Sequence, residues 1–132
     1  MNARWNHSAT CVYNIGYHVI WCPKYRRKYL RGSIENRLKE ILIAKATEMA
    51  CTIDTMEVMP DHIHIFIKCP PTKAIANVVQ GLKGYSSRIL RQEFPLLASM
   101  KSLWTRSYYC ETVGHISQQT VTKYIEDQKT KL

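Results

Sequence analysis

The sequence lacks the patterns that mark several common classes of protein. Its five cysteines are scattered and include no CxxC pair, so neither a disulfide framework nor a zinc knuckle is expected. No apolar run approaches the roughly 20 residues that cross a bilayer, and residues 1–10 lack the charged-then-apolar pattern of a signal peptide. These absences predict a cytoplasmic protein without a membrane span, whose cysteines are small buried thiols.

Acidic residues are also scarce. Ten Asp and Glu stand against nineteen Lys and Arg, which gives a net charge of +9. This excess favours a polyanionic partner, nucleic acid first and an acidic membrane surface second. Charge alone is equally consistent with a basic protein that its charge keeps soluble. Repeats and low-complexity segments are absent, and the 132 residues, 45% of them hydrophobic, predict one globular domain over residues 1–132.

Hydrophobic patterning predicts four strands, two core helices and a terminal helix. The strands are expected where β-branched and aromatic residues gather, at 10–22, 51–58, 62–69 and 103–112. One helix follows Ser33 as its N-cap, a second runs from a Thr72 cap to Pro95, and the last begins at Ser117. The order β-α-β-β-α-β predicts an α+β fold, a ferredoxin-like or RRM-like sheet with its helices on one face and the other face open for a ligand.

The segment MPDHIHIFIK (59–68) carries the first candidate site. Side chains alternate along a strand, so His62 and His64 point to the open face while the isoleucines between and after them point to the helices. Two imidazoles on one face of an apolar strand favour a divalent metal site over two half-buried polar residues satisfied by neighbours. A third ligand must come from elsewhere, because Cys69 lies on the isoleucine face and Asp61 does too, unless the turn at 60–61 redirects it.

Tyr124 and Gln128 lie four residues apart, so they share one face of the terminal helix. In isolation they are better explained as a packing anchor and a solvated end residue, since the chain holds eight tyrosines. Five segments in a fixed order change that interpretation. They are YHVIWCPKYRRKYL (17–30), MPDHIHIFI (59–67), KGYSSRILRQEFP (83–95), LWTRSYYCETVG (103–114) and TVTKYIEDQ (120–128). Together, over nearly the whole chain, they resemble the single-tyrosine HUH transposases of the smallest bacterial and archaeal insertion sequences, the insertion sequence 200/605 type.

By this resemblance, His62 and His64 are ligands of Mg²⁺ or Mn²⁺, Gln128 helps to complete the metal shell, and Tyr124 is the catalytic nucleophile. The family cuts single-stranded DNA at element ends that carry hairpins, through a 5′-phosphotyrosine, and rejoins it without ATP. It works as a homodimer in which the tyrosine helix of one subunit can serve the histidine pair of the other. The resemblance also favours a mobile terminal helix, about residues 117–129, with Gly114 in its joint.

Basic residues interleaved with aromatic ones would hold the DNA through its phosphates and through stacked bases. The candidates are Lys24, Tyr25, Arg26, Arg27 and Lys28, and, on the second helix, Lys83, Arg88 and Arg91. For any one of them, a merely solvated side chain is the alternative. Gly81 and Gly84 weaken the same helix, which is consistent with the close approach of DNA or of a partner helix.

Two other functions stay open. A related HUH nuclease for repeated palindromic elements or replication would use the same histidines and tyrosine. A non-catalytic RRM-like binder would use the open sheet face alone, but the RRM consensus is absent from the sequence.

Overall fold

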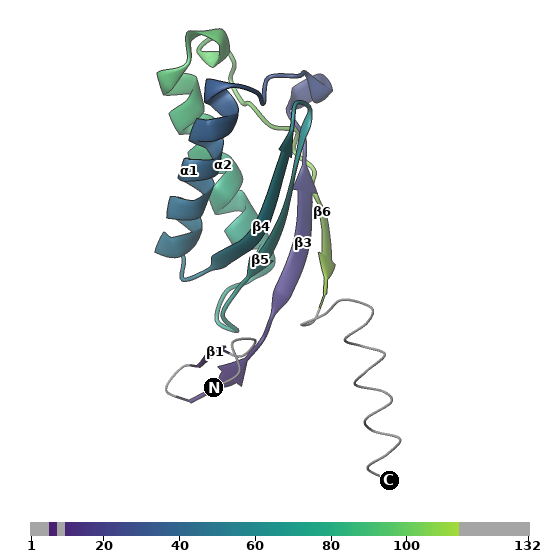
Figure 1. Ribbon diagram of the computed structural model, residues 1–132, viewed down its shortest axis with the longest axis vertical. Coiled ribbons are helices and arrows are strands. Elements are labelled where there is room, and N and C mark those ends of the chain that lie inside the picture. The colour runs from purple at the N-terminus through teal and green to yellow at the C-terminus, as the bar shows by residue number, and fades with distance from the viewer. Residues whose placement is uncertain (1–5, 8–9, 114–132) are drawn as a thin grey trace.

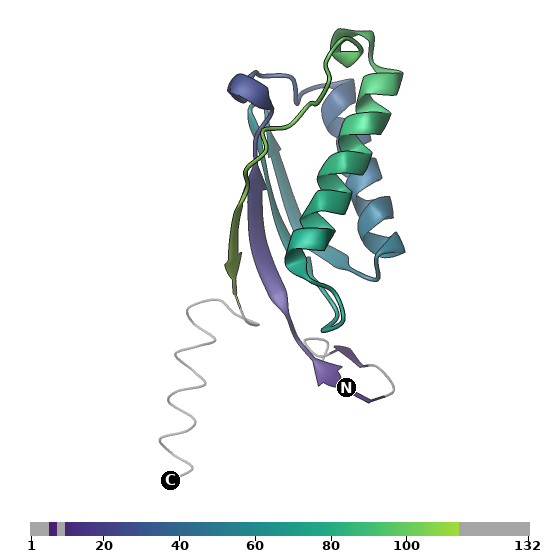
Figure 2. The same ribbon diagram turned by 180° about the vertical axis from the view of Figure 1, so that it is seen from behind.

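The computed structural model describes residues 6–7 and 10–113, whose main part is a four-stranded antiparallel sheet covered by two helices (Figure 1). The sheet has the strand order β4-β5-β3-β6. Its strands are β3 (Gly16–Trp21), β4 (Thr52–Met59), β5 (His62–Lys68) and β6 (Tyr109–Thr112). Helices α1 (Ser33–Glu48) and α2 (Ile75–Glu93) both lie on one side of the sheet, and the views from front and back agree on this (Figures 1 and 2). The α+β fold expected from the sequence is therefore confirmed.

Strand alternation builds the core between the sheet and the helices. The isoleucines of β5 are fully buried beneath α1 and α2, as expected from a strand whose odd positions are apolar. The other fully buried large side chains include Val19, Leu38, Leu42, Leu82 and Leu90. Cys51 and Cys69 are buried, whereas Cys11, Cys22 and Cys110 are half-buried.

The prediction of one long strand over residues 10–22 is wrong, because the segment forms two strands with different partners. β2 (Val12–Tyr13) pairs with β1 (Asn6–His7) in a separate two-stranded sheet. β3 starts only at Gly16 and joins the main sheet. Asn14 and Gly16, which have low β-propensity, stand at the break, but propensity alone does not show that the backbone hydrogen bonds change partner there.

Both helices begin without the side-chain caps expected from the sequence. Ser33 is the first residue of α1, and the N-cap is Gly32, whose φ of 63° suits a residue without a Cβ. α2 begins after Ala74, because Thr72 lies in a turn in which the Lys73 amide donates to the Pro70 carbonyl. No helix within the described ranges is long and apolar enough to cross a membrane.

The fourth strand is shorter than the expected 103–112. Only Tyr109–Thr112 pairs with β3, and the preceding residues cross from the helix layer to the sheet (Figure 2). Two serines of α2 hold this crossing: the Trp104 indole donates to Ser86 Oγ at 3.0 Å, and the Leu103 amide donates to Ser87 Oγ at 3.1 Å. The two serines are buried on the apolar side of α2 because they accept these bonds.

The two glycines of α2 have different surroundings. A Cβ on Gly81 would lie 2.9 Å from Met49 Sδ, at the end of α1, so this glycine permits the expected close approach of a helix. A Cβ on Gly84 would meet no heavy atom within 4 Å. Gly81 therefore serves helix packing, and Gly84 faces open space.

Candidate active site

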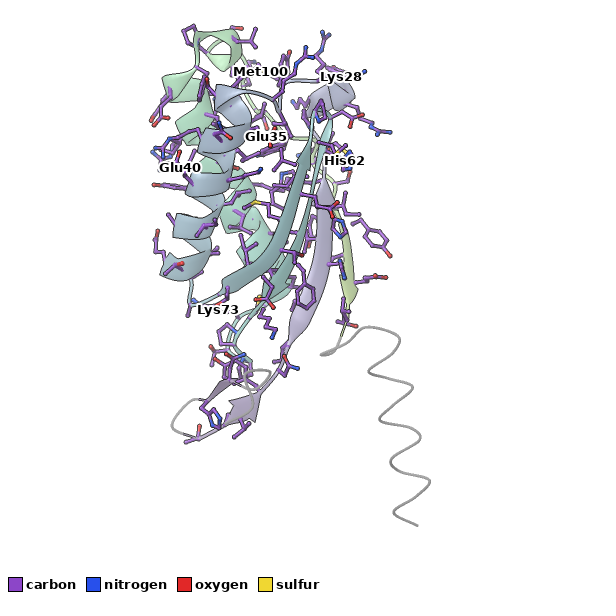
Figure 3. All side chains as sticks on the ribbon, in the orientation of Figure 1. Lys28, Glu35, Glu40, His62, Lys73 and Met100 are labelled. Atoms are coloured by element: carbon purple, nitrogen blue, oxygen red, sulfur yellow. The ribbon has the colours of Figure 1, made fainter. Side chains whose placement is uncertain are left out.

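The histidine pair lies where the strand alternation puts it. His62 and His64 project from β5 to the face of the sheet opposite the helices, while Ile63 and Ile65 are fully buried under them. In the ladder, His64 is flanked by Glu57 of β4 and Ile20 of β3. Figure 3 shows His62 at the end of the sheet where the basic segment with Lys28 also lies. The open face thus carries both imidazoles, as expected.

Asp61 is hydrogen-bonded to the first of these histidines. Its Oδ1 lies 2.9 Å from His62 Nδ1, and its Oδ2 lies 3.1 Å from the Arg26 guanidinium. The bond with His62, and next the charge of Arg26, lower the pKa of the Asp61 carboxyl below its ordinary value. The turn at 60–61 therefore brings Asp61 beside the histidines, which the sequence left open.

His18 is a third imidazole at the site, and the sequence analysis missed it. Its Nδ1 lies 2.8 Å from His64 Nε2, and its ring stacks obliquely on Phe66 with centroids 5.2 Å apart. One of the two nitrogens donates and the other accepts. A signal was present in the sequence: Val19 and Trp21 define the buried side of their strand, which places His18 on the open face.

Glu111 and Tyr109 of β6 extend the polar face beyond β3. Glu111 pairs with His18 in the ladder, and Tyr109 pairs with Ile20. The Tyr109 hydroxyl donates to Glu111 Oε2 at 2.8 Å, and this bond raises the pKa of the exposed Tyr109 phenol. A carboxylate thus holds the proton of a tyrosine on the same face as the histidines.

The donor set suits a divalent cation but is incomplete in the described residues. The carboxylate of Asp61 is ionised and can only accept, so His62 donates from Nδ1 and keeps the lone pair of Nε2 for a ligand. Among residues 6–7 and 10–113, no group of three or more His, Cys, Asp or Glu side chains could hold a metal. Tyr124 and Gln128, expected to join the pair, lie outside the described residues, as do Gly114 and the segment 117–129 expected to form the terminal helix.

The basic segment after β3 stands close to the histidines. It begins with the short helix η1 (Lys24–Arg26), in which Tyr25 and Arg26 have φ of 60° and 50°. This left-handed backbone leaves the Tyr25 ring 84% exposed, with the Arg27 guanidinium 5.7 Å from its centroid. An exposed ring flanked by cations is suited to stacking on an unpaired base.

Helix α2, which carries the remaining basic candidates, lies in the helix layer on one side of the sheet (Figure 2), whereas the histidines project from the opposite face. Lys83 donates to the carbonyl oxygens of Thr105 and Ser107, and burial lowers the pKa of its ammonium group. Arg91 donates to the Met100 carbonyl and to Ser87. Arg88 is exposed over the Tyr85 ring at 5.2 Å. Lys83 and Arg91 line a groove of about 380 Å³ beside segment 101–108, and their role in DNA binding stays a prediction.

Known proteins resemble this chain both in sequence and in fold. Residues 11–128 match the family described as Transposase IS200 like. The chain is 40% identical over 123 residues to the ISDra2 transposase TnpA of Deinococcus radiodurans, covering 91% of this chain and 88% of that protein. It is 31% identical over 119 residues to the transposase for insertion sequence element IS200 of Salmonella typhimurium, covering 88% of this chain and 78% of that protein.

Solved structures also resemble this one. A crystal structure described as that of a transposase from D. radiodurans R1 has a TM-score of 0.77 at 34% identity, covering 93% of this chain and 97% of that chain. The REP-associated tyrosine transposase, solved bound to a REP hairpin, has a TM-score of 0.62 at 12% identity, covering 90% and 67%, and shares the fold alone. On the family match and the 40% and 31% identities, the chain belongs to the IS200-like transposases, enzymes that cleave DNA and transfer its strands.

Proposed function

We propose that this transposase cleaves and rejoins single-stranded DNA at the ends of its insertion sequence through a covalent bond to Tyr124. A divalent cation, Mg²⁺ or Mn²⁺, is held by His62 and His64 with Gln128 completing the shell. The observation that carries the proposal is the pair of imidazoles on the open sheet face, one of them already bonded to a carboxylate. Such a carboxylate–histidine pair is typical of metal ligands.

The donor set favours Mn²⁺ as the ion to use in an experiment. Mg²⁺ prefers oxygen ligands, and imidazole nitrogens suit softer divalent ions. When bound at this site, the ion would supply positive charge beside the scissile phosphate. His64 would have to exchange its bond with His18 for the ion if it binds through Nε2.

Attack by Tyr124 exchanges one ester bond for another. The phenolate oxygen bonds to phosphorus, the bond to the 3′-oxygen breaks, and that oxygen takes up a proton to become a 3′-hydroxyl. A 5′-phosphotyrosine remains, so a second 3′-hydroxyl can displace the tyrosine without ATP.

Chain length permits Tyr124 to reach the histidines. Thr112 pairs with Tyr17, three residues along β3 from Ile20, which pairs with His64. Three residues of strand span about 10 Å, and Tyr124 lies twelve positions after Thr112. A tyrosine at that separation can serve the pair in its own subunit or, in a homodimer, in the partner.

The basic segment would bind the DNA strand that enters the site. Lys24, Arg26, Arg27 and Lys28 would contact phosphates, and the Tyr25 ring would stack on an unpaired base, an interaction worth about 1–3 kcal/mol. A protein of the same fold has been solved bound to a REP hairpin, which supports hairpin ends as the substrate.

The test is a covalent adduct. The full-length protein is incubated with Mn²⁺ and labelled single-stranded hairpin DNA from the element ends, then denatured. We expect a labelled protein band that is lost in Tyr124→Phe and His64→Ala. Tyr109→Phe is the matched control, because Tyr109 is an exposed tyrosine on the histidine face whose proton is held by Glu111. If the band disappears only in Tyr109→Phe, the nucleophile is wrongly assigned.

A related nuclease for repeated palindromic elements would form the same adduct, so the two enzymes are distinguished by the DNA that they prefer to cut. It would cut palindromic repeats in preference to the insertion-sequence ends. An RRM-like binder would bind the strand and form no adduct with any DNA.

A further inference from the structure

Three side chains from two segments form a connected set at the edge of the site. Arg26 follows β3, and Asp61 and His62 close the turn between β4 and β5. The guanidinium lies 3.1 Å from one carboxylate oxygen, and His62 Nδ1 lies 2.9 Å from the other. Each oxygen of Asp61 therefore has its own partner.

The backbone holds these two segments together. The Leu30 amide donates to the Pro60 carbonyl at 3.0 Å, which ties the basic segment to the turn. The amide of Arg26 donates to the Pro23 carbonyl at 2.8 Å, in the left-handed stretch that directs its side chain to Asp61. A left-handed backbone at two successive residues other than glycine is unfavourable and persists where the surroundings require it. The backbone hydrogen bonds from Lys24 to the Leu103 carbonyl and from Leu30 to the Pro60 carbonyl are part of such surroundings.

The carboxylate decides which nitrogen of His62 is available. A neutral imidazole has one N–H and one lone pair. Because Asp61 can only accept, the proton of His62 resides on Nδ1 and the lone pair on Nε2. The same bond fixes the rotation of the ring.

We propose that Asp61 is the positioning residue that orients His62 for cation binding, and that Arg26 holds Asp61 in place. The inference rests on the proposed cation site at His62 and His64. It also gives Arg26 a structural role besides the phosphate contact expected from the sequence. Loss of an outer partner of this kind weakens metal affinity by about 10- to 100-fold in other sites.

The first test measures Mn²⁺ affinity of the full-length protein without DNA, by the electron paramagnetic resonance signal of free Mn²⁺. We expect Asp61→Ala to weaken binding by about 10- to 100-fold. Asp61→Asn, which keeps an acceptor oxygen, should restore part of this loss. Arg26→Ala should weaken binding by about two- to fivefold, as fits an exposed ion pair.

Two matched variants control for charge. Asp54→Ala removes a carboxylate that pairs with Lys68 on the same sheet, and Arg31→Ala removes an exposed cation from the same basic segment. Both should bind Mn²⁺ as the unmodified protein does. Equal losses in the controls would mean that net charge, and not position, sets the affinity.

A second test does not depend on the metal. In ¹H–¹⁵N long-range spectra, His62 of the metal-free protein should show a protonated Nδ1 and a bare Nε2. Asp61→Ala should shift its proton toward Nε2, whereas Asp54→Ala should not. An unchanged His62 spectrum in Asp61→Ala would overturn the proposal, even if the variant were less stable.

The results separate this inference from the proposed function. If His62→Ala abolishes Mn²⁺ binding and Asp61→Ala leaves it within twofold, Asp61 is not a positioning residue and the cation site stands. If His62→Ala binds Mn²⁺ as tightly as the unmodified protein, the cation site itself is wrongly placed and both proposals fail.

Discussion

Replacing Lys83 by Met distinguishes a structural cation from a DNA contact. The ammonium group donates to the carbonyl oxygens of Thr105 and Ser107 at 2.6 and 3.1 Å, and so holds the segment that leads into β6. Met has a similar length and no donor, so it removes both bonds while filling much of the same space.

The expected loss follows from the exposure of the two bonds. A hydrogen bond from a charged donor contributes about 1.5–3 kcal/mol. The bond to Thr105 is half-buried and the bond to Ser107 is exposed, so the second contributes less. Burial of the ammonium group, which lowers its pKa, is a cost that Met partly removes. We therefore expect a net loss of about 2 kcal/mol, or roughly 6–10 °C in Tm for a domain of this size.

Urea unfolding followed by tryptophan fluorescence measures the loss, because Trp21 and Trp104 are buried. Arg88→Met is the matched control: Arg88 is an exposed cation of the same helix, and its replacement should change stability by less than about 0.5 kcal/mol. Binding of single-stranded hairpin DNA is measured for both variants by fluorescence anisotropy. The reasoning is refuted if Lys83→Met unfolds at the urea concentration of the unmodified protein and loses DNA affinity tenfold.

Three further predictions concern pH, metal binding and packing. Arg37 holds the pKa of Glu93 below its ordinary value, so the stability from this pair is present above about pH 4.5 and is lost as pH falls through the lowered pKa. Thermal melts should show Glu93→Gln less stable at pH 7, with a difference that shrinks as the pH is lowered. His18→Phe removes the hydrogen-bond partner of His64 and leaves that imidazole available to the ion. Calorimetry should therefore show Mn²⁺ affinity rising by about fivefold, whereas a tenfold fall would mean that His18 is itself a ligand. Gly84→Ala should stabilise the protein by about 0.5–1 kcal/mol in urea unfolding. Gly81→Ala should stabilise it by less, because the new Cβ would press against Met49, and the reverse order would refute this reasoning.

The face assignment on β5 could be predicted because it depends only on strand alternation. Once Ile63, Ile65 and Ile67 form the core, the side chains between them must face the other way. The helix layer followed from the same kind of local periodicity. These features need no knowledge of which strands are neighbours.

Features that depend on neighbours could not be predicted from local patterns. His18 approaches His64 because β3 pairs with β5, a contact between residues 46 positions apart. The buried Ser86 looks like a polar interruption of an apolar face until the Trp104 indole is seen to donate to it. Asp61 depended on the direction of one turn, which alternation within the strand does not define.

The hydrogen bond from Tyr109 to Glu111 bears on which of the eight tyrosines of the chain could act as a nucleophile. Glu111 raises the pKa of the Tyr109 phenol above its ordinary value, so this accessible ring is even less ionised at neutral pH than an isolated tyrosine, although it shares a surface with the histidines. Selection of the nucleophile would then depend partly on an acid that disfavours the ionised form of Tyr109, and not only on activation of the proposed nucleophile Tyr124.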